Sequence, residues 1–279
     1  MQYFFYLIIS KIILLSYLFS NSKVKNKWVI LFKYLAYEII NPSYINFGWL
    51  KFTSFDKWAL KFLFWEIFVR NEYFFETTSI KPTIIDLWAN TWAWIMYFKY
   101  LYPNSIIYAF EPDELAYNIL QNNVNNNNLT DVYAYNEWIS DKTWEVKFYT
   151  NSSEKNWNFT MSINKNRELN WKEVIIKTKS LYEFIIENKI EKIDMLKIDI
   201  EWAEDILFKM QEINNVMTIT DKLVMEYHHN IPETKSNLDL ILNVLKNNNF
   251  TYQIDTICFP LQSYNKYQDI YIYAYKIIK

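Results

Sequence analysis

Apolar runs and segments of helical periodicity alternate along the chain from residue 83 onward. Buried strands are expected at the apolar runs 83–87, 105–110, 131–135, 193–198 and 222–227. Helices are expected at 93–101, 114–123, 181–188, 203–210 and 233–247. Asp113 precedes the second helix as its N-cap. The alternation predicts an α/β fold with a doubly wound, mostly parallel sheet and helices on both of its faces.

Two parts of the pattern depart from this alternation. Segments 145–150 and 174–178 alternate apolar and polar residues, and they predict an inserted β-ribbon. Segments 252–257 and 269–277 do the same at the end of the chain and predict an antiparallel C-terminal pair. The asparagine run 125–128 predicts a loop after the second helix.

Lys81-Pro82 marks the expected boundary between two parts of the chain. A proline disfavours helical conformation in the residue before it, so a new element begins here. We therefore expect an N-terminal helical extension or cap at 1–80, including a helix at 60–69, and a sheet domain at 81–279.

Residues 3–19 are almost entirely apolar, with Lys11 near their centre and lysines at 23, 25 and 27 behind them. A spanning helix needs about 20 mainly apolar residues, so this segment is short for one. Two interpretations stay open, a membrane-associated helix held by the following lysines and a helix that packs against the protein or a partner. We expect a cytoplasmic protein, membrane-associated if the first interpretation holds.

Charge and cysteine content narrow the class of protein further. The net charge is −2 and the lysines are scattered, which argues against a nucleic-acid-binding surface. The single cysteine, Cys258, cannot form an internal disulfide, as suits a reducing compartment. No cluster of cysteine and histidine has the spacing of a zinc site, and we expect no metal, although Asp199, Glu201 and Glu226 could in principle hold a cation.

The glycine and tryptophan counts are the most unusual feature of the composition. The chain has 1 glycine and 12 tryptophans, whereas average usage of about 7% glycine would give about 20. Trp88 and Trp92 fall in the turn after strand 83–87, where positive φ and a bare backbone are wanted. We hypothesise that most of the 12 tryptophans stand for glycines, encoded by UGA in an organism that reads this codon as glycine and translated here as tryptophan. The alternative is a protein truly rich in tryptophan, and the mass of its native tryptic peptides decides between them.

Polar residues stand at the ends of successive predicted strands: Asp86, Glu111, Asn136 with Glu137, and Asp199 with Glu201. The carboxyl ends of parallel strands meet at one edge of the sheet, where such folds bind ligands. An acid such as Glu111 suits the hydroxyls of a ribose. The glycine candidates after Asp86 do not match the dinucleotide pattern and suit a ligand with a cationic amino-acid end. S-adenosylmethionine is such a ligand, and a nicotinamide dinucleotide remains the alternative.

Three stretches, IIDLWANTW at 84–92, IYAFEPD at 107–113 and MLKIDIEWAE at 195–204, carry a resemblance to a known family. Together with WEIFVRNEYF at 65–74, they resemble the FkbM family of S-adenosylmethionine-dependent methyltransferases, provided that Trp88, Trp92 and Trp202 stand for glycine. The resemblance implies a Rossmann-like class I methyltransferase domain at 81–279. It further implies O-methyl transfer, often to a sugar hydroxyl of a glycan or natural product.

The candidate site residues follow from the strand ends and this resemblance. Candidates for binding S-adenosylmethionine are Asp86, Leu87, Trp88, Ala89, Asn90, Trp92, Glu111, Pro112, Glu137 and Trp138. Asp199 is the first candidate for the base that takes the acceptor's proton, Glu201 the second and His228 an alternative. Asp199 could instead only bind the cofactor or a loop, and Lys197 is expected to form a structural ion pair.

Two other functions remain open at this stage, an NAD-dependent sugar oxidoreductase or epimerase and a non-catalytic Rossmann-like interaction domain. The second follows if the tryptophans are genuine, because indoles would then block the turn. The expected partner is a small-molecule or glycan acceptor, and the sequence gives no indication of oligomeric state.

Overall fold

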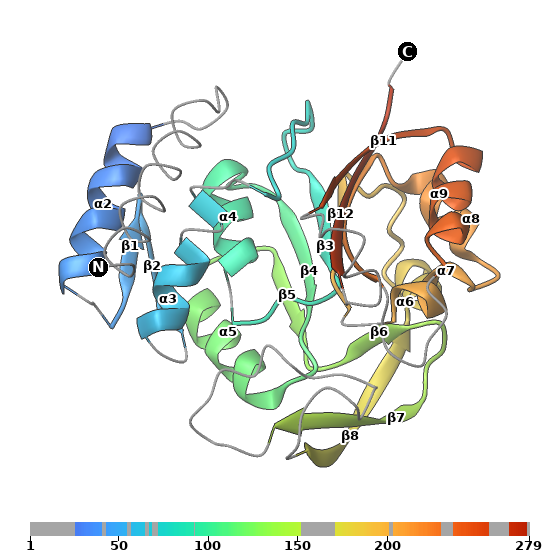
Figure 1. The fold of residues 1–279 in the computed structure, drawn as a ribbon, viewed down its shortest axis with the longest axis horizontal. Coiled ribbons are helices and arrows are strands. Elements are labelled where there is room, and N and C mark those ends of the chain that lie inside the picture. The colour runs from blue at the N-terminus through green and yellow to red at the C-terminus, as the bar shows by residue number, and fades with distance from the viewer. Residues whose placement is uncertain are drawn as a thin grey trace, which may run out of the picture.

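The computed structural model describes residues 26–40, 43–54, 57–64, 67–68, 72–91, 93–151, 171–200, 203–229, 237–256 and 268–277. Its centre is a seven-stranded sheet with the order β11-β12-β10-β9-β3-β4-β5 (Figure 1). The strands are β3 (Thr83–Asp86), β4 (Ile106–Phe110), β5 (Val132–Tyr135), β9 (Met195–Ile198), β10 (Lys222–His229), β11 (Phe250–Thr256) and β12 (Gln268–Lys276).

The strand order confirms the predicted doubly wound sheet. β3 pairs in parallel with β4 on one side and with β9 on the other, and β4–β5 and β9–β10 are also parallel. The order therefore reverses between β3 and β9, which is where such sheets bind ligands. β12 is antiparallel to both β10 and β11, as expected for the C-terminal pair.

Helices cover both faces of the sheet because both faces of its central strands are apolar. Ile84, Met195 and Val224 belong to a core that they share with α4 (Ala93–Leu101) and α5 (Glu114–Asn126). The residues that follow them, Ile85, Leu196 and Met225, belong to the core on the opposite face. That second core includes α6 (Leu181–Glu187), α7 (Glu204–Phe208), α8 (Ile213–Ile219) and α9 (Leu238–Asn247). Strands that are buried on both faces consist of continuous apolar runs, and these runs are the pattern that predicted the central strands.

The predicted β-ribbon is present as β7 (Glu145–Asn151) and β8 (Trp171–Ser180), an antiparallel pair. A short strand that the sequence did not indicate, β6 (Trp138–Ser140), joins it by pairing in parallel with β8. Helix α8 was also not predicted. β6 spans three residues, too few to show a period, and α8 spans seven, in which Ile213, Val216 and Met217 have helical spacing for only about two turns.

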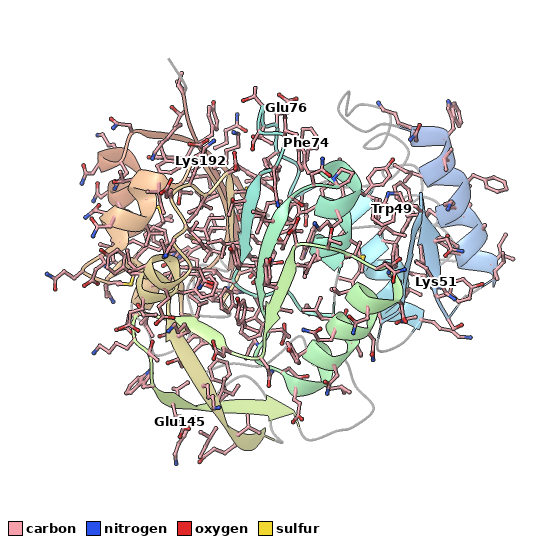
Figure 2. The ribbon with its side chains drawn as sticks, turned by 180° about the vertical axis from the view of Figure 1, so that it is seen from behind. Trp49, Lys51, Phe74, Glu76, Glu145 and Lys192 are labelled. Atoms are coloured by element: carbon pink, nitrogen blue, oxygen red, sulfur yellow. The ribbon has the colours of Figure 1, made fainter. Side chains whose placement is uncertain are left out.

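The N-terminal part consists of α2 (Lys27–Ile40), a hairpin of β1 (Ile45–Phe47) and β2 (Leu50–Phe52), and α3 (Lys57–Phe64). The hairpin turns at Gly48, the chain's one glycine, with φ 58. Figure 2 shows Trp49 and Lys51 of this hairpin at the end of the molecule opposite Lys192. The helix expected at 60–69 thus begins earlier, at Lys57, and α3 ends at Phe64.

The asparagine-rich run is helical for longer than its composition indicated. We expected a loop at 125–128, but α5 continues to Asn126 with Asn127 as its C-cap. Asn127 and Asn123 on this helix hold the edge of the N-terminal hairpin. Asn127 accepts from the backbone N–H of Lys51 (2.7 Å) and donates to its carbonyl (2.6 Å). These tertiary hydrogen bonds explain why the helix persists.

Among the described residues, no helix combines the length and the apolar character needed to cross a bilayer. Residues 3–19, for which membrane contact was considered, lie outside the described part of the chain.

Candidate active site

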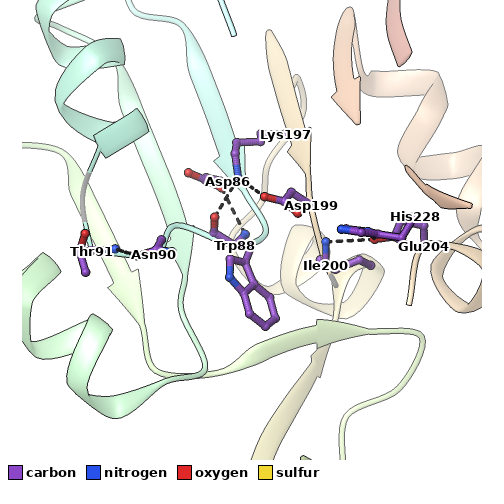
Figure 3. A network of polar contacts seen from close by, with 9 residues as sticks. All are labelled: Asp86, Trp88, Asn90, Thr91, Lys197, Asp199, Ile200, Glu204 and His228. Atoms are coloured by element: carbon purple, nitrogen blue, oxygen red, sulfur yellow. Dashed lines mark hydrogen bonds and ion pairs between the residues drawn. The ribbon is translucent and has the colours of Figure 1, made fainter. Parts of the chain in front are cut away.

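The end of β3 is held by a buried ion pair at the centre of the sheet. Lys197 on β9 places its Nζ 3.0 Å from Oδ1 of Asp86, and both side chains are fully buried. The same Nζ donates to the carbonyl oxygen of Trp88 (2.8 Å) and lies 3.7 Å from Oδ2 of Asp199 (Figure 3). One ammonium group therefore fixes the end of β3, the turn after it and the residue that follows β9.

The charges of this group follow from its surroundings. Burial by itself lowers the pKa of Lys197, but the carboxylates of Asp86 and Asp199 outweigh it and leave that pKa raised. Burial raises the pKa of Asp86, although Lys197 opposes this shift. Oδ2 of Asp86 has no hydrogen-bond partner among the described residues. An oxygen in this state stabilises any cationic or N–H group that comes within reach of it.

The turn after β3 departs from our expectation for Trp88. We expected positive φ there, but in the described part of the turn the residue with positive φ is Asn90, with φ 51. Asparagine tolerates this conformation because its short side chain can bond locally, and Asn90 Oδ1 accepts from the N–H of Thr91. The conformation of Trp88 therefore does not by itself require glycine. Trp92 and Trp202 lie outside the described residues.

What distinguishes Trp88 is the place of its ring. The indole is 5% exposed and belongs to the core formed with β7 and the helices beyond it, with its centroid 6.4 Å from that of Phe148. Figure 3 shows the indole extending from the turn away from Lys197. It occupies volume directly beside the end of β3, where a glycine would leave space.

Glu111 at the end of β4 is a second buried carboxyl group. Its Oε1 accepts from the N–H of Asp113 (2.8 Å), while its Oε2 is buried with no hydrogen-bond partner among the described residues. Burial raises the pKa of Glu111 well above its ordinary value, and the nearby carboxyls of Asp113 and Asp86 add to the shift. Glu111 and Asp86 thus lie close together, each with one unsatisfied oxygen.

Beside Glu111 the surface opens into a cleft of about 1000 Å³. Its walls are the start of α5, the end of β5 and the middle of β8, and they include Pro112 and Glu137. Trp138 is instead buried in the core, edge-on to Phe148 at 4.8 Å between centroids, and its Nε1 has no partner among the described residues. A cleft of this size accommodates a nucleoside-sized ligand.

The predicted catalytic residues separate in the structure. Asp199 is at the sheet edge beside Lys197, and its side chain is 20% exposed. His228 on β10 is buried and its Nδ1 lies 2.9 Å from Oε1 of Glu204, at the start of α7 (Figure 3). Glu201 lies outside the described residues.

Tyr73 belongs to this site although the sequence did not single it out. Its ring packs on Trp94 at 3.8 Å between centroids and lies 5.3 Å from Nζ of Lys197. Burial raises its pKa well above the ordinary value, and the carboxylates of Asp199 and Glu226 add to that shift. Tyr73 lies 10 residues before the first strand of the sheet, within the stretch 65–74 that contributed to the family resemblance, but the resemblance assigned no role to it.

A family model described as the methyltransferase FkbM domain matches residues 84–252, more than half of the chain. The match contains the carboxyl ends of β3, β4, β9 and β10.

Two curated relatives are both methyltransferases. Methyltransferase sdnD from Sordaria araneosa is 27% identical over 189 residues, which cover 58% of this chain and 73% of that protein. Methyltransferase 1 from Beauveria bassiana is 27% identical over 163 residues, which cover 53% of this chain and 66% of that protein.

Solved structures of similar shape share little sequence. The StiE O-MT has a TM-score of 0.44 at 7% identity, covering 76% of this chain and 73% of that one. Precorrin-6y C5,15-methyltransferase from Geobacter metallireducens has a TM-score of 0.39 at 10% identity, covering 71% of this chain and 81% of that one.

The polar groups of the site fit S-adenosylmethionine. The unsatisfied oxygen of Glu111 can accept from ribose hydroxyls, and that of Asp86 can accept from the ammonium of the methionine part. The match excludes the dehydrogenase and non-catalytic alternatives as the main function. The chain belongs to the FkbM methyltransferase domain family and is an S-adenosylmethionine-dependent methyltransferase.

Proposed function

We propose that this enzyme methylates a hydroxyl oxygen, on a sugar of a glycan or natural product, and that Asp199 is the base. The observation that carries the proposal is the difference in exposure within the Asp86–Lys197–Asp199 group. Asp86 and Lys197 are fully buried, whereas Asp199 is 20% exposed, so an acceptor can reach only Asp199 among these three. No comparison identifies the acceptor, which is inferred from the family resemblance.

Bound S-adenosylmethionine supplies a methyl group on a sulfonium, ready for displacement by an oxygen nucleophile. In our proposal Asp86 binds the ammonium group of the cofactor and Glu111 binds its ribose. The backbone of Leu87, Ala89 and Asn90 lines the binding site. Asp199 takes the proton of the acceptor hydroxyl as the oxygen–carbon bond forms and the carbon–sulfur bond breaks. The Lys197 ammonium, 3.7 Å away, orients the Asp199 carboxylate.

His228 and Glu201 are the alternative bases. Oε1 of Glu204 engages Nδ1 of His228 and holds its ring, which makes it less free than Asp199 to rotate toward an acceptor. Pro112 and Glu137 are proposed to meet the adenosine side of the cofactor from the neighbouring cleft, with Trp138 behind them. Trp92 remains a candidate cofactor-binding residue on the sequence alone.

Replacing Asp199 by asparagine tests the base. The variant keeps the shape of the side chain but cannot take a proton, and we expect turnover to fall about 100-fold or more while the Kd for S-adenosylmethionine stays within a few-fold. Transfer of labelled methyl to hydroxylated acceptors gives the first value, and titration calorimetry the second. Unchanged turnover would remove Asp199 as the base and leave His228 to be tested in the same way.

We also propose that position 88 is glycine in the native protein, because the indole of Trp88 fills space in the turn directly after Asp86, against Phe148. The variant Trp88→Gly should bind S-adenosylmethionine at least tenfold more tightly, a gain of about 1.4 kcal/mol, in calorimetric titration. Trp144→Gly is the control, because that indole is 56% exposed and outside the cleft. Equal affinity of Trp88→Gly and the unaltered chain would contradict the proposal.

For the N-terminal part we propose a cap at 1–80 that contacts a membrane surface. The support is the apolar segment 3–19 followed by lysines in the sequence, and the apolar outer face of α2. An amphipathic helix with large apolar side chains on one face and nearby lysines is the kind that lies in a membrane interface.

A further inference from the structure

The pairing of β10 with β12 places three metal-ligating residues on one face of the sheet. Glu226 and His228 are two positions apart on β10, so their side chains point to the same side. The antiparallel register sets His228 opposite Asp269 on β12. Directly opposed residues in such a pair project to the same face. This is the face on which Lys197 and Tyr73 also lie, because Val224, two residues before Glu226, belongs to the core that includes Tyr73.

The three side chains converge. One ligand atom from each of Glu226, His228 and Asp269 can be chosen so that all three lie within 4.8 Å of one another. Oδ1 of Asp269 is buried and has no hydrogen-bond partner among the described residues. A buried carboxylate oxygen without a partner costs free energy that a bound cation would recover.

The orientation of His228 is an independent indication. Its Nδ1 is 2.9 Å from Oε1 of Glu204, and both side chains are almost completely buried (Figure 3). Histidines that bind metals through one ring nitrogen usually donate from the other to a carboxylate, which fixes the ring and its tautomer. With Glu204 as that carboxylate, Nε2 is the nitrogen that carries the lone pair.

We propose that Glu226, His228 and Asp269 bind one divalent cation of the Mn²⁺ or Zn²⁺ type. One imidazole and two carboxylates suit these ions, whereas Mg²⁺ and Ca²⁺ prefer oxygen ligands alone. Three protein ligands leave coordination positions open for a small molecule.

The cation would lie beside the acceptor side of the active site. Glu226 is near enough to Lys197 and to Tyr73 to influence the pKa of both, and Asp199 influences the same two groups. The role of the ion rests on the proposed function: it would bind the acceptor hydroxyl and favour loss of its proton to Asp199.

Direct metal binding tests the site without methyl donor or acceptor. The full chain is freed of metal with a chelator and titrated with MnCl₂, and free Mn²⁺ is followed by its electron paramagnetic resonance signal. We expect one tightly bound Mn²⁺ per chain, and a higher melting temperature in its presence. Binding of Zn²⁺ is measured in the same way by titration calorimetry. A chain that binds neither one Mn²⁺ nor one Zn²⁺ would overturn the proposal.

Variants locate the bound ion. Asp269→Asn and Glu226→Gln should each weaken binding at least about tenfold, the scale seen even for groups that only support metal ligands. Asp255→Asn, an exposed carboxylate on the adjacent strand β11, is the matched control and should bind as the unaltered chain does. Circular dichroism identifies any variant that does not fold, and the second variant then decides. Equal binding by all folded variants would also overturn the site, while leaving the Asp199 test unaffected.

Discussion

Burial controls the chemistry of individual residues in this protein. Lys197, Asp86 and Glu111 have ionisable side chains that are almost completely buried. Lys197 and Asp86 compensate each other directly, whereas Glu111 accepts the N–H of Asp113 on one oxygen and has no hydrogen-bond partner for the other among the described residues. A buried carboxyl group of this kind favours its neutral form, and a ligand that donates to it reverses the preference.

The buried carboxyl group of Glu111 leads to a prediction of how the stability of the folded protein changes with pH. Burial raises its pKa in the folded protein above the ordinary value of 4.5, so the folded state binds more protons than the unfolded state between these two pKa values. The stability it contributes is therefore present below pH 4.5 and is lost as pH rises toward the folded pKa. Glu111→Gln removes this loss and should unfold at a higher temperature than the unaltered chain at pH 8.

Thermal unfolding of both proteins without cofactor between pH 4.5 and 8 measures the effect, with 4.5 as the ordinary pKa of the group. The same variant should bind S-adenosylmethionine more weakly, because an amide accepts ribose hydroxyls less strongly than a carboxylate. Glu145→Gln, an exposed change on β7, should alter neither property. If the Glu111→Gln variant loses more stability than the unaltered chain as pH rises, the prediction is contradicted.

Among the elements, α5 connects the N-terminal hairpin to the sheet. Asn123 is 1% exposed, accepts from the N–H of Thr53 (3.0 Å), and donates to the carbonyls of Thr53 (2.9 Å) and Thr91 (3.2 Å). Thr91 belongs to the turn after β3. The helix therefore links the N-terminal hairpin to the turn that we propose binds the cofactor.

Asn123→Ala should destabilise the fold by about 1–3 kcal/mol, because it leaves buried backbone groups without partners. Denaturant unfolding measures this loss. Asn122→Ala replaces an exposed neighbour on the same helix and should have little effect. Similar stabilities of the two variants would show that the buried hydrogen bonds are replaceable.

For the molecule as a whole, the outer surface of α2 is the most apolar exposed helix face described. Trp28, Phe32 and Ile39 are 73%, 75% and 85% exposed. Helix α2, which carries them, lies at the side of the molecule opposite α8 and α9 (Figure 1). Contiguous exposed apolar side chains of this size usually mark a contact surface.

If that surface meets a membrane, the double variant Trp28→Ser, Phe32→Ser should bind vesicles containing phosphatidylserine at least about tenfold more weakly, because each buried ring contributes about 1.5–3 kcal/mol. Co-sedimentation with the vesicles measures the binding. Ile186→Ser, an exposed apolar residue on α6, is the control. Absence of vesicle binding by the unaltered chain would reject membrane contact.

The sequence by itself determined the sheet and the polar edge at which we propose that the cofactor binds. Strands β3, β4 and β9 read as largely apolar runs, and an acid ends β3 at 86 or follows β4 at 111 and β9 at 199. Local order along the chain was enough for these features, because each depends on neighbours in sequence. The N-cap Asp113 was predicted for the same reason.

Only the tertiary structure decided which distant groups meet. Glu204 with His228, Asp269 with Glu226, and Asn123 with Thr53 are joined by strand pairing and helix packing, which leave no period or spacing in the sequence. The same holds for Trp88, where we expected positive φ and the structure places that conformation at Asn90. Backbone strain can shift to whichever neighbour tolerates it, but the volume of an indole beside the end of β3 depends on everything packed around it.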